Sequence, residues 1–303
     1  MRTVLIDANH LLSRTFHVPS FQHLKCIVDN ETVFVGATFG FLNSLRIIAS
    51  TYPSDIMVVV WDGGGSNFRK EIYAEYKANR EPRSNEFIYQ LQLTKEFLTL
   101  LGVRQIQISN TEADDIIGVL TKKSRKFGYK VLIISGDKDF NQLVSQNVNV
   151  VNPRQGEDGA DRIMTPEVVK ERYGIPPSLF VDYLALNGDS TDNINGIDGI
   201  GKKTSKELIQ CNGNIEDIVK VDIHYKFASD GVKKPISSKL QEKINKHKEQ
   251  LILNKKLVTI CTDMDITVDS KVKPDFLKLK TMFKKYEFNS FIREFETFVA
   301  NFS

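Results

Sequence analysis

Acidic residues recur where apolar segments of this chain end. The runs TVLI, IMVVVW and VLIIS each lead within two residues to an aspartate, and a further cluster opens a helix-like stretch. Such a repeated arrangement predicts that the fold gathers negative charge at one edge of a sheet. At an effective dielectric near 20, two carboxylates ~4 Å apart repel by ~4 kcal/mol, so the group requires cations. The nine acids are Asp7, Asp62, Glu112, Asp114, Asp115, Asp137, Asp139, Asp189 and Asp192.

Strand-like and helix-like segments alternate through the first half of the chain. Four short segments rich in β-branched residues are predicted strands: 3–8, 56–61, 103–108 and 131–135. Two segments between them, 37–50 and 116–128, have the apolar spacing of helices. This alternation predicts an α/β fold with a mainly parallel sheet and helices on both faces. Ligands of such sheets bind beyond the carboxyl ends of the strands, where Asp7, Asp62 and Asp137 fall.

The pattern changes at about residue 165. Thr165 is a predicted N-cap with Pro166 at the first helical position, and a second helix is predicted after Pro177. The next predicted strand is LVTICT at 257–262. We therefore expect an α/β core over residues 1–164 and a mostly helical part over residues 165–303.

Composition excludes several classes of protein. The chain has 303 residues with 41% hydrophobic content, and no apolar run is long enough to span a bilayer. Its first acid comes too early for a secretory signal peptide, and its three cysteines are widely spaced without a CxxC motif. These features predict a cytoplasmic protein without disulfides or structural zinc. The net charge is only +3, but pooling nine acids in one pocket leaves the remaining surface more basic.

The acidic clusters supply only oxygen ligands, which favour Mg²⁺ or Mn²⁺. The chemistry that requires such a set is phosphodiester hydrolysis by two divalent ions roughly 3.5–4 Å apart. There are structural alternatives. A single acid at a strand end can cap the next helix, the acids of TEADD suit a first helical turn, and GDSTDN can form Asx turns.

The segment GIDGIGKKTSKELI at 196–209 is a candidate phosphate-binding element. Gly199 and Gly201 predict a tight turn, and Lys202, Lys203 and Thr204 then open an apolar-periodic helix. Backbone N–H groups at a helix N-terminus, with lysines beside them, suit a phosphodiester. The pattern resembles a helix-hairpin-helix motif, which holds duplex backbone without reading sequence. The alternative is a glycine-rich turn between two packed helices.

The segment NFRKEIYAEYKANREPR at 67–83 is basic and carries interleaved aromatic residues. On a helix, Arg69, Tyr73, Tyr76 and Arg80 would share one face. Such a face suits a nucleic-acid strand by charge and stacking. The alternative is a solvated run of charge. The predicted contacts with DNA in this segment are Arg69, Lys70, Tyr76, Lys77 and Arg80.

Taken together, FRKEIYAEYKANR, TEADDIIGVL, ISGDKDFNQLV and FVDYLALNGDSTDNINGIDGIGKKTS resemble the 5′-nuclease family. That family includes the N-terminal domain of bacterial DNA polymerase I, bacteriophage 5′–3′ exonucleases and flap endonucleases. The resemblance covers nearly the whole chain. It implies a PIN-like, mainly parallel central sheet, a helical arch over about 67–102, and a C-terminal part with a helix-hairpin-helix at about 186–210.

The resemblance also implies roles for residues. Asp7, Asp62, Glu112 and Asp114, with Asp115 close by, would surround a first Mg²⁺, for which Mn²⁺ can substitute. Asp137, Asp139, Asp189 and Asp192 would surround a second. Lys77 and Arg80 match catalytic basic positions at the base of the arch, Tyr76 would stack on a base, and K⁺ would bind at the hairpin. Residues 81–101 are less basic than many arches of the family.

We therefore predict a stand-alone, monomeric, Mg²⁺-dependent 5′–3′ exonuclease and flap endonuclease. Its substrates would be DNA with 5′ ends, flaps or nicks, including RNA-primed strands, and its role the removal of RNA primers or flaps during replication. The products would carry a 5′-phosphate and a 3′-hydroxyl. Two alternatives stay open at this point: a PIN-type ribonuclease, and a non-catalytic protein that binds branched DNA.

Overall fold

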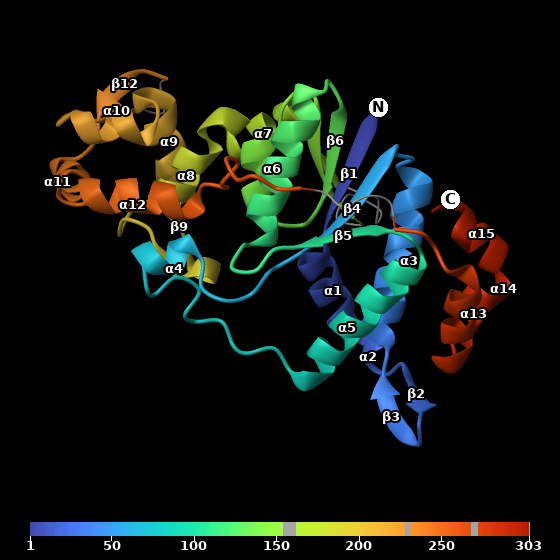
Figure 1. Cartoon of the computed structure of the whole chain (residues 1–303). Coiled ribbons are helices and arrows are strands. Elements are labelled where there is room, and N and C mark those ends of the chain that lie inside the picture. Colours follow the sequence, from blue (N-terminus) through green and yellow to red (C-terminus); the bar gives the residue numbers. More distant parts are fainter. Residues whose placement is uncertain (154–161, 228–230, 268–271, 303) are drawn as a thin grey trace. The chain divides into compact units, whose positions relative to one another are not determined.

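The computed structural model describes residues 1–153, 162–227, 231–267 and 272–302 (Figure 1). The chain forms two compact units. Unit 1 comprises residues 1–65, 82–136 and 262–303, and unit 2 comprises residues 66–81 and 137–261. The division expected at residue 164 does not coincide with these units. Residues 137–164 group with the helical part, and the C-terminal helices return to the α/β part.

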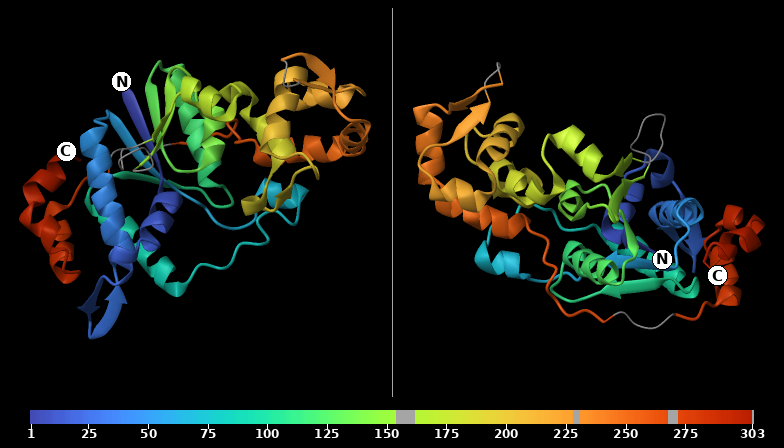
Figure 2. Two further views of the ribbon diagram at one scale, coloured as in Figure 1. Left: turned by 180° about the vertical axis from the view of Figure 1, so that it is seen from behind. Right: turned by 90° about the horizontal axis from the view of Figure 1, so that it is seen from above.

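Unit 1 is built on four parallel strands in the order β5-β4-β1-β6. Helix α6 lies on one face of this sheet and helices α1 and α3 lie on the other (Figures 1 and 2). The predicted α/β alternation is therefore confirmed. The elements are β1 (Arg2–Asp7), α1 (Ala8–Phe16), α2 (Pro19–Gln22), β2 (Lys25–Val28), β3 (Glu31–Phe34), α3 (Gly36–Thr51), β4 (Ile56–Trp61), α5 (Asn85–Leu100), β5 (Arg104–Gln107), α6 (Ala113–Lys126), β6 (Lys130–Ile134), α13 (Phe276–Lys285), α14 (Asn289–Arg293) and α15 (Phe295–Ala300).

The central strands are apolar on both sides because helices cover both faces of the sheet. Leu5, Ile6, Val59 and Val60 are fully buried. The register pairs Ile6 with Val59 and Asp7 with Val60, so β1 and β4 end within one residue of each other. Their carboxyl ends therefore open at the same edge of the sheet.

Unit 2 is mostly helical, with short antiparallel strand pairs β7–β8, β9–β10 and β11–β12. Helix α12 packs along α8, and α8 packs on α9. The elements are α4 (Phe68–Ile72), the 3-10 helix η1 (Lys138–Leu143), β7 (Val148–Asn152), β8 (Arg162–Met164), α7 (Pro166–Tyr173), η3 (Pro177–Leu179), α8 (Phe180–Asn187), β9 (Gly188–Asp189), η4 (Ser190–Asp192), β10 (Ile194–Asn195), α9 (Lys202–Asn212), α10 (Ile215–Lys220), β11 (Tyr225–Phe227), β12 (Lys233–Pro235), α11 (Ser238–Lys246) and α12 (Lys248–Val258).

The strand predicted at 257–262 is wrong. Helix α12 continues to Val258, and residues 260–262 have no regular structure. The buried positions Leu251, Asn254, Leu257 and Val258 follow helical spacing, so burial of that face outweighs the β-propensity of the short run VTI.

The helix cap predicted at Thr165 is confirmed. The Thr165 hydroxyl accepts a hydrogen bond from Val168 N (3.3 Å), and Pro166 occupies the first helical position of α7.

None of the helices in the described ranges is both long enough and apolar enough to span a bilayer.

Candidate metal centre and nucleic-acid interface

The first acidic group lies in unit 1, at the carboxyl ends of its strands. Asp7 is the last residue of β1 and only 6% exposed. Its carboxylate accepts hydrogen bonds from His10 N (3.1 Å) and from the Ser135 hydroxyl (2.8 Å), which follows β6. Asp7 therefore caps α1, as the structural alternative expected, and is also fixed at the edge where a ligand of such a sheet binds.

Asp62 is held against the start of α6. Its Oδ1 accepts a hydrogen bond from Ala113 N (3.0 Å), and its own N–H donates to Asn9 Oδ1 (2.8 Å). The next residue, Gly63, donates its N–H to Thr111 O (2.9 Å), and a Cβ there would overlap the carbonyl oxygen of Ile108. A glycine is therefore required for this close approach.

The TEADD acids open α6 beside Asp62. Glu112 occupies the N-cap position, and Asp114 and Asp115 lie in the first turn, with Asp115 almost completely buried. Because Asp62 binds the backbone of Ala113, the strand end and the helix start are joined directly. Arg83 Nη2 lies 3.3 Å from Asp62 Oδ2 and supplies positive charge to this group.

The second acidic group lies in unit 2, around η1 and the loop after α8. Asp137 caps η1 and accepts a hydrogen bond from Asp139 N (2.9 Å). Asp189 accepts one from Thr191 N (2.9 Å), so the Asx-type turn is present. Asp139 is half-buried, but its Oδ1 is shielded from solvent and has no hydrogen-bond partner within the described residues. An unsatisfied buried carboxylate oxygen is unfavourable and fits a cation ligand.

Burial and neighbouring charge act together on this group. Burial raises the pKa of Asp139 well above its usual range, and the charge of Asp137 raises it further, while Lys138 acts in the opposite direction. Burial alone would lower the pKa of Lys138, but its hydrogen bond to Asp189 and the charges of Asp189, Asp139 and Asp137 outweigh burial and raise it. The fold thus surrounds Asp139 with negative charge and disfavours its ionised form.

These shifts predict how stability depends on pH in the presence of EDTA. Since the folded-state pKa of Asp139 lies above its unfolded value, its favourable contribution is full below about pH 4. That contribution is lost as the pH rises through the folded-state pKa. We expect the free energy of unfolding of Asp139→Asn to fall less than that of the wild type as the pH rises from about 4 through the folded-state pKa. Urea denaturation at a series of pH values measures both free energies. An unchanged slope would contradict this assignment.

The basic segment predicted to form a helical face does not do so. Helix α4 ends at Ile72, Tyr73 is extended, and Lys77 has a left-handed backbone with φ 55°. Contacts with the loop after α8 replace the helix: Lys77 N donates to Asp192 O (2.9 Å), and Asn79 Nδ2 donates to Ser190 O (2.9 Å). The predicted 4-3-4 face over residues 69–80 is therefore wrong.

Two predicted DNA contacts in this segment are buried. Arg69 is 2% exposed, and its guanidinium donates to the carbonyls of Leu257 (2.8 Å) and Thr259 (2.7 Å). Tyr76 is also 2% exposed, and its hydroxyl donates to Asp192 Oδ2 (3.1 Å). In this arrangement both side chains support the fold of unit 2 and neither offers a surface to DNA, whereas Lys70 is exposed as expected.

Lys77 and Arg80 converge on a predicted metal ligand. Arg80 Nη2 lies 2.6 Å from Asp192 Oδ1, and Lys77 Nζ lies 3.7 Å from Asp192 Oδ2. The structure therefore brings the two predicted catalytic cations to the second acidic group.

The predicted helix-hairpin-helix joins α8 to α9. Gly199 has φ 87°, a conformation that favours glycine, and Gly201 is the N-cap of α9 without a side-chain cap. Lys202 and Lys203 are exposed at this end of the helix, and Thr204 is partly exposed. Side chains from α11 and α12 hold the hairpin in place. Lys243 Nζ of α11 bonds to Asp198, and the buried Asn254 Nδ2 of α12 donates to Ala185 O and Asn195 O.

The donor chemistry of the nine acids fits hard divalent cations, since every side chain offers carboxylate oxygens. Five of them lie in unit 1 and four in unit 2. Among the described residues, no three histidine, cysteine or acidic side chains converge closely enough to hold one ion. Sequence reasoning missed Asn9, Ser135 and Lys138, although Lys138 stands between two predicted ligands in GDKD.

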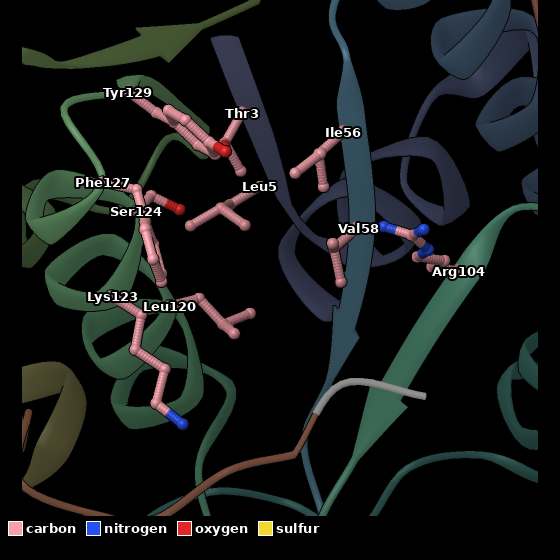
Figure 3. Close-up of a pocket in the computed structure, with 10 residues that line it drawn as sticks. All are labelled: Thr3, Leu5, Ile56, Val58, Arg104, Leu120, Lys123, Ser124, Phe127 and Tyr129. Carbon is pink, nitrogen blue, oxygen red and sulfur yellow. The ribbon is translucent and has the colours of Figure 1, made fainter. Parts of the chain in front are cut away.

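A cavity of about 310 Å³ opens elsewhere in unit 1 (Figure 3). Leu5 and Val58 of the sheet face Leu120 of α6 and Phe127, the residue that follows α6, across it. Its lining is mainly apolar, and none of the predicted site residues contributes to it. The cavity is therefore separate from the acidic groups.

Comparison with protein families identifies the chain. The model for the 5′-3′ exonuclease N-terminal resolvase-like domain matches residues 2–174, and that for the 5′-3′ exonuclease C-terminal SAM fold matches residues 175–282. The chain belongs to the 5′-3′ exonuclease family, as its motifs predicted.

Two curated relatives and one solved structure illustrate this. The chain is 36% identical over 296 residues to DNA polymerase I of Thermus aquaticus, covering 97% of this chain but only 33% of that protein. It is 36% identical over 301 residues to a 5′-3′ exonuclease of Aquifex aeolicus, covering 97% and 95% of the two chains. The fold matches the bacteriophage T5 flap endonuclease in complex with DNA and metal ions, with 22% identity, 99% and 100% coverage and a TM-score of 0.68.

Proposed function

We propose that this chain is a structure-specific 5′-nuclease that hydrolyses DNA near the junction of a 5′ single strand and a duplex, with two Mg²⁺ ions. The observation that carries the proposal is Asp139, whose buried Oδ1 has no hydrogen-bond partner in the part of the chain that the structure describes and which interacts with Asp137, Asp189 and Asp192. Solved structures of the T5 nuclease with bound divalent metal ions, and in one case with DNA, support the same chemistry.

Each part of the chain has a role in this proposal. The nine acids would hold the ions, which activate water and stabilise the leaving oxygen when bound. The hydrogen bonds from His10 N and the Ser135 hydroxyl orient Asp7. Asp62 is oriented by the hydrogen bond that its Oδ1 accepts from Ala113 N and by the one that its own N–H donates to Asn9 Oδ1. Lys77 and Arg80 position the phosphate by charge. Products with a 5′-phosphate and 3′-hydroxyl, a role in flap or RNA-primer removal in the cytoplasm, and K⁺ at the hairpin belong to the same proposal.

The hairpin lysines give a measurable prediction about duplex binding. Lys202→Ala and Lys203→Ala should each weaken binding uniformly across sequences, because both side chains would contact phosphate rather than bases. Each should also reduce the slope of log affinity against log salt concentration by about 0.9. Fluorescence anisotropy over a salt series measures this, and slopes equal to that of the wild type would exclude these lysines from the interface.

Comparing substrates distinguishes the proposal from its rivals. We expect cleavage of 5′-flapped DNA in preference to unstructured RNA of equal length. A preference for single-stranded RNA would favour the PIN-type ribonuclease. Binding of flapped DNA in Mg²⁺ without any change in product length would favour the non-catalytic protein.

A further inference from the structure

Lys138 lies inside the second acidic group. Its Nζ is 2.7 Å from Asp189 Oδ2, and the Asp189 side chain is only 8% exposed whereas that of Lys138 is 41% exposed. The ammonium group therefore reaches in from the surface to a largely buried carboxylate. Such a contact is stronger than an exposed ion pair because water screens it less.

The fold fixes Lys138 in this position. The side chain comes from η1, which packs against α8, the helix that leads directly to Asp189. The charged and titratable groups that interact with it are Asp139 from η1, Asp137 at the N-cap of η1, Tyr183 from α8, and Asp189 from β9. One ammonium group thus acts on three carboxylates.

We propose that Lys138 is an internal counter-ion that sets the divalent-cation affinity of the second acidic group by competing for Asp189. The inference rests on the proposed function, because it assumes that this group binds such cations. A divalent ion that takes Asp189 as a ligand must displace the Lys138 ammonium group or bind beside it. Like charges repel at such short range, so either route weakens cation binding.

The same contact stabilises the fold when divalent ions are withheld. Unit 2 brings together four acidic side chains, Asp137, Asp139, Asp189 and Asp192. Burial already disfavours the ionised form of Asp139. Removing the lysine charge leaves this repulsion less compensated. Lys138 therefore favours the folded chain without cations while it opposes their binding, and the two effects have opposite signs.

The test measures Mn²⁺ binding to the full chain without DNA, by isothermal titration calorimetry. Lys138→Met removes the charge and keeps the chain length, Lys138→Gln removes the charge but can still hydrogen-bond to Asp189, and Lys138→Arg keeps the charge. The matched control is Lys170→Met, an exposed lysine on α7 of the same unit. We expect both neutral variants to bind Mn²⁺ roughly tenfold more tightly, and Lys138→Arg and Lys170→Met to bind like the wild type.

Thermal unfolding supplies a second readout. In EDTA, Lys138→Met should melt below the wild type, and saturating Mn²⁺ should remove or reverse that difference. Neutral variants with wild-type or weaker Mn²⁺ affinity would overturn the inference, and so would slow cleavage at unchanged Mn²⁺ affinity, which would indicate a direct contact with the substrate. If the wild type itself bound no Mn²⁺, the proposed function would fail instead.

Discussion

Replacing Asp137 or Asp139 with asparagine is expected to abolish cleavage of a 5′-flap substrate, with a loss on the order of 10³-fold or more, while DNA binding survives. Asparagine keeps the size of the side chain but removes the charge that a divalent ion requires. Asp139 is the more informative position, because its Oδ1 is buried without a hydrogen-bond partner among the described residues. Single-turnover cleavage in Mg²⁺ and anisotropy with the same flap separate catalysis from binding.

The control for this pair is Asp217→Asn, an exposed aspartate of α10 in the same unit. It changes the net charge equally and is expected to cut at the wild-type rate. Retained cleavage by both active-site variants would exclude a metal-ligand role for Asp137 and Asp139. A loss of activity in the control would indicate a nonspecific effect of charge.

Removing either cation beside Asp192 is expected to slow cleavage by about 10²-fold without unfolding the chain. Lys77→Ala and Arg80→Ala each delete a charge that lies within 4 Å of this carboxylate and that would position the phosphate. Arg80 has a half-exposed side chain, so its loss leaves no large cavity. The rate comes from single-turnover cleavage, and circular dichroism melting checks the fold.

Lys170→Ala is the matched control, since it removes an exposed lysine of the same unit. Wild-type cleavage by Lys77→Ala or Arg80→Ala would remove that residue from the catalytic machinery. A large drop in melting temperature would instead assign its main effect to the docking of residues 73–80 on the loop after α8.

The sequence predicted the parts of the fold that depend on local pattern. Apolar strands with β-branched residues identified the sheet, and its parallel order brings the ends of β1 and β4 to one edge, where Asp7 and Asp62 lie. Acids at those ends serve as helix caps and as candidate ligands at the same time, so the two interpretations weighed for Asp7 are compatible. The tight turn at Gly199 and Gly201 was likewise predicted from the sequence, and Gly199 has the positive φ that such a turn requires.

Long-range contacts account for what the sequence did not predict. The segment FRKEIYAEYKANR has a helical spacing of basic and aromatic residues. Its second half is nevertheless not helical, and Tyr76, Lys77 and Arg80 contact the Asp192 carboxylate instead. Arg69 looked like a DNA contact, but its carbonyl partners lie about 190 residues away in the chain. Lys138 was not predicted as a site residue, because a lysine between two aspartates in the sequence resembles an ordinary solvated charge. Only the fold shows that Asp189, 51 residues away in the chain, lies beside it.

The most direct test of the central claim is cleavage of a 5′-flapped duplex, labelled first at the 5′ end and then at the 3′ end of the flap strand, with Mg²⁺ or with EDTA. The proposed nuclease should release a short 5′ fragment cut near the junction and leave a 5′-phosphate on the duplex, only when Mg²⁺ is present. An intact flap strand in Mg²⁺, or the same products in EDTA, would contradict a metal-dependent 5′-nuclease.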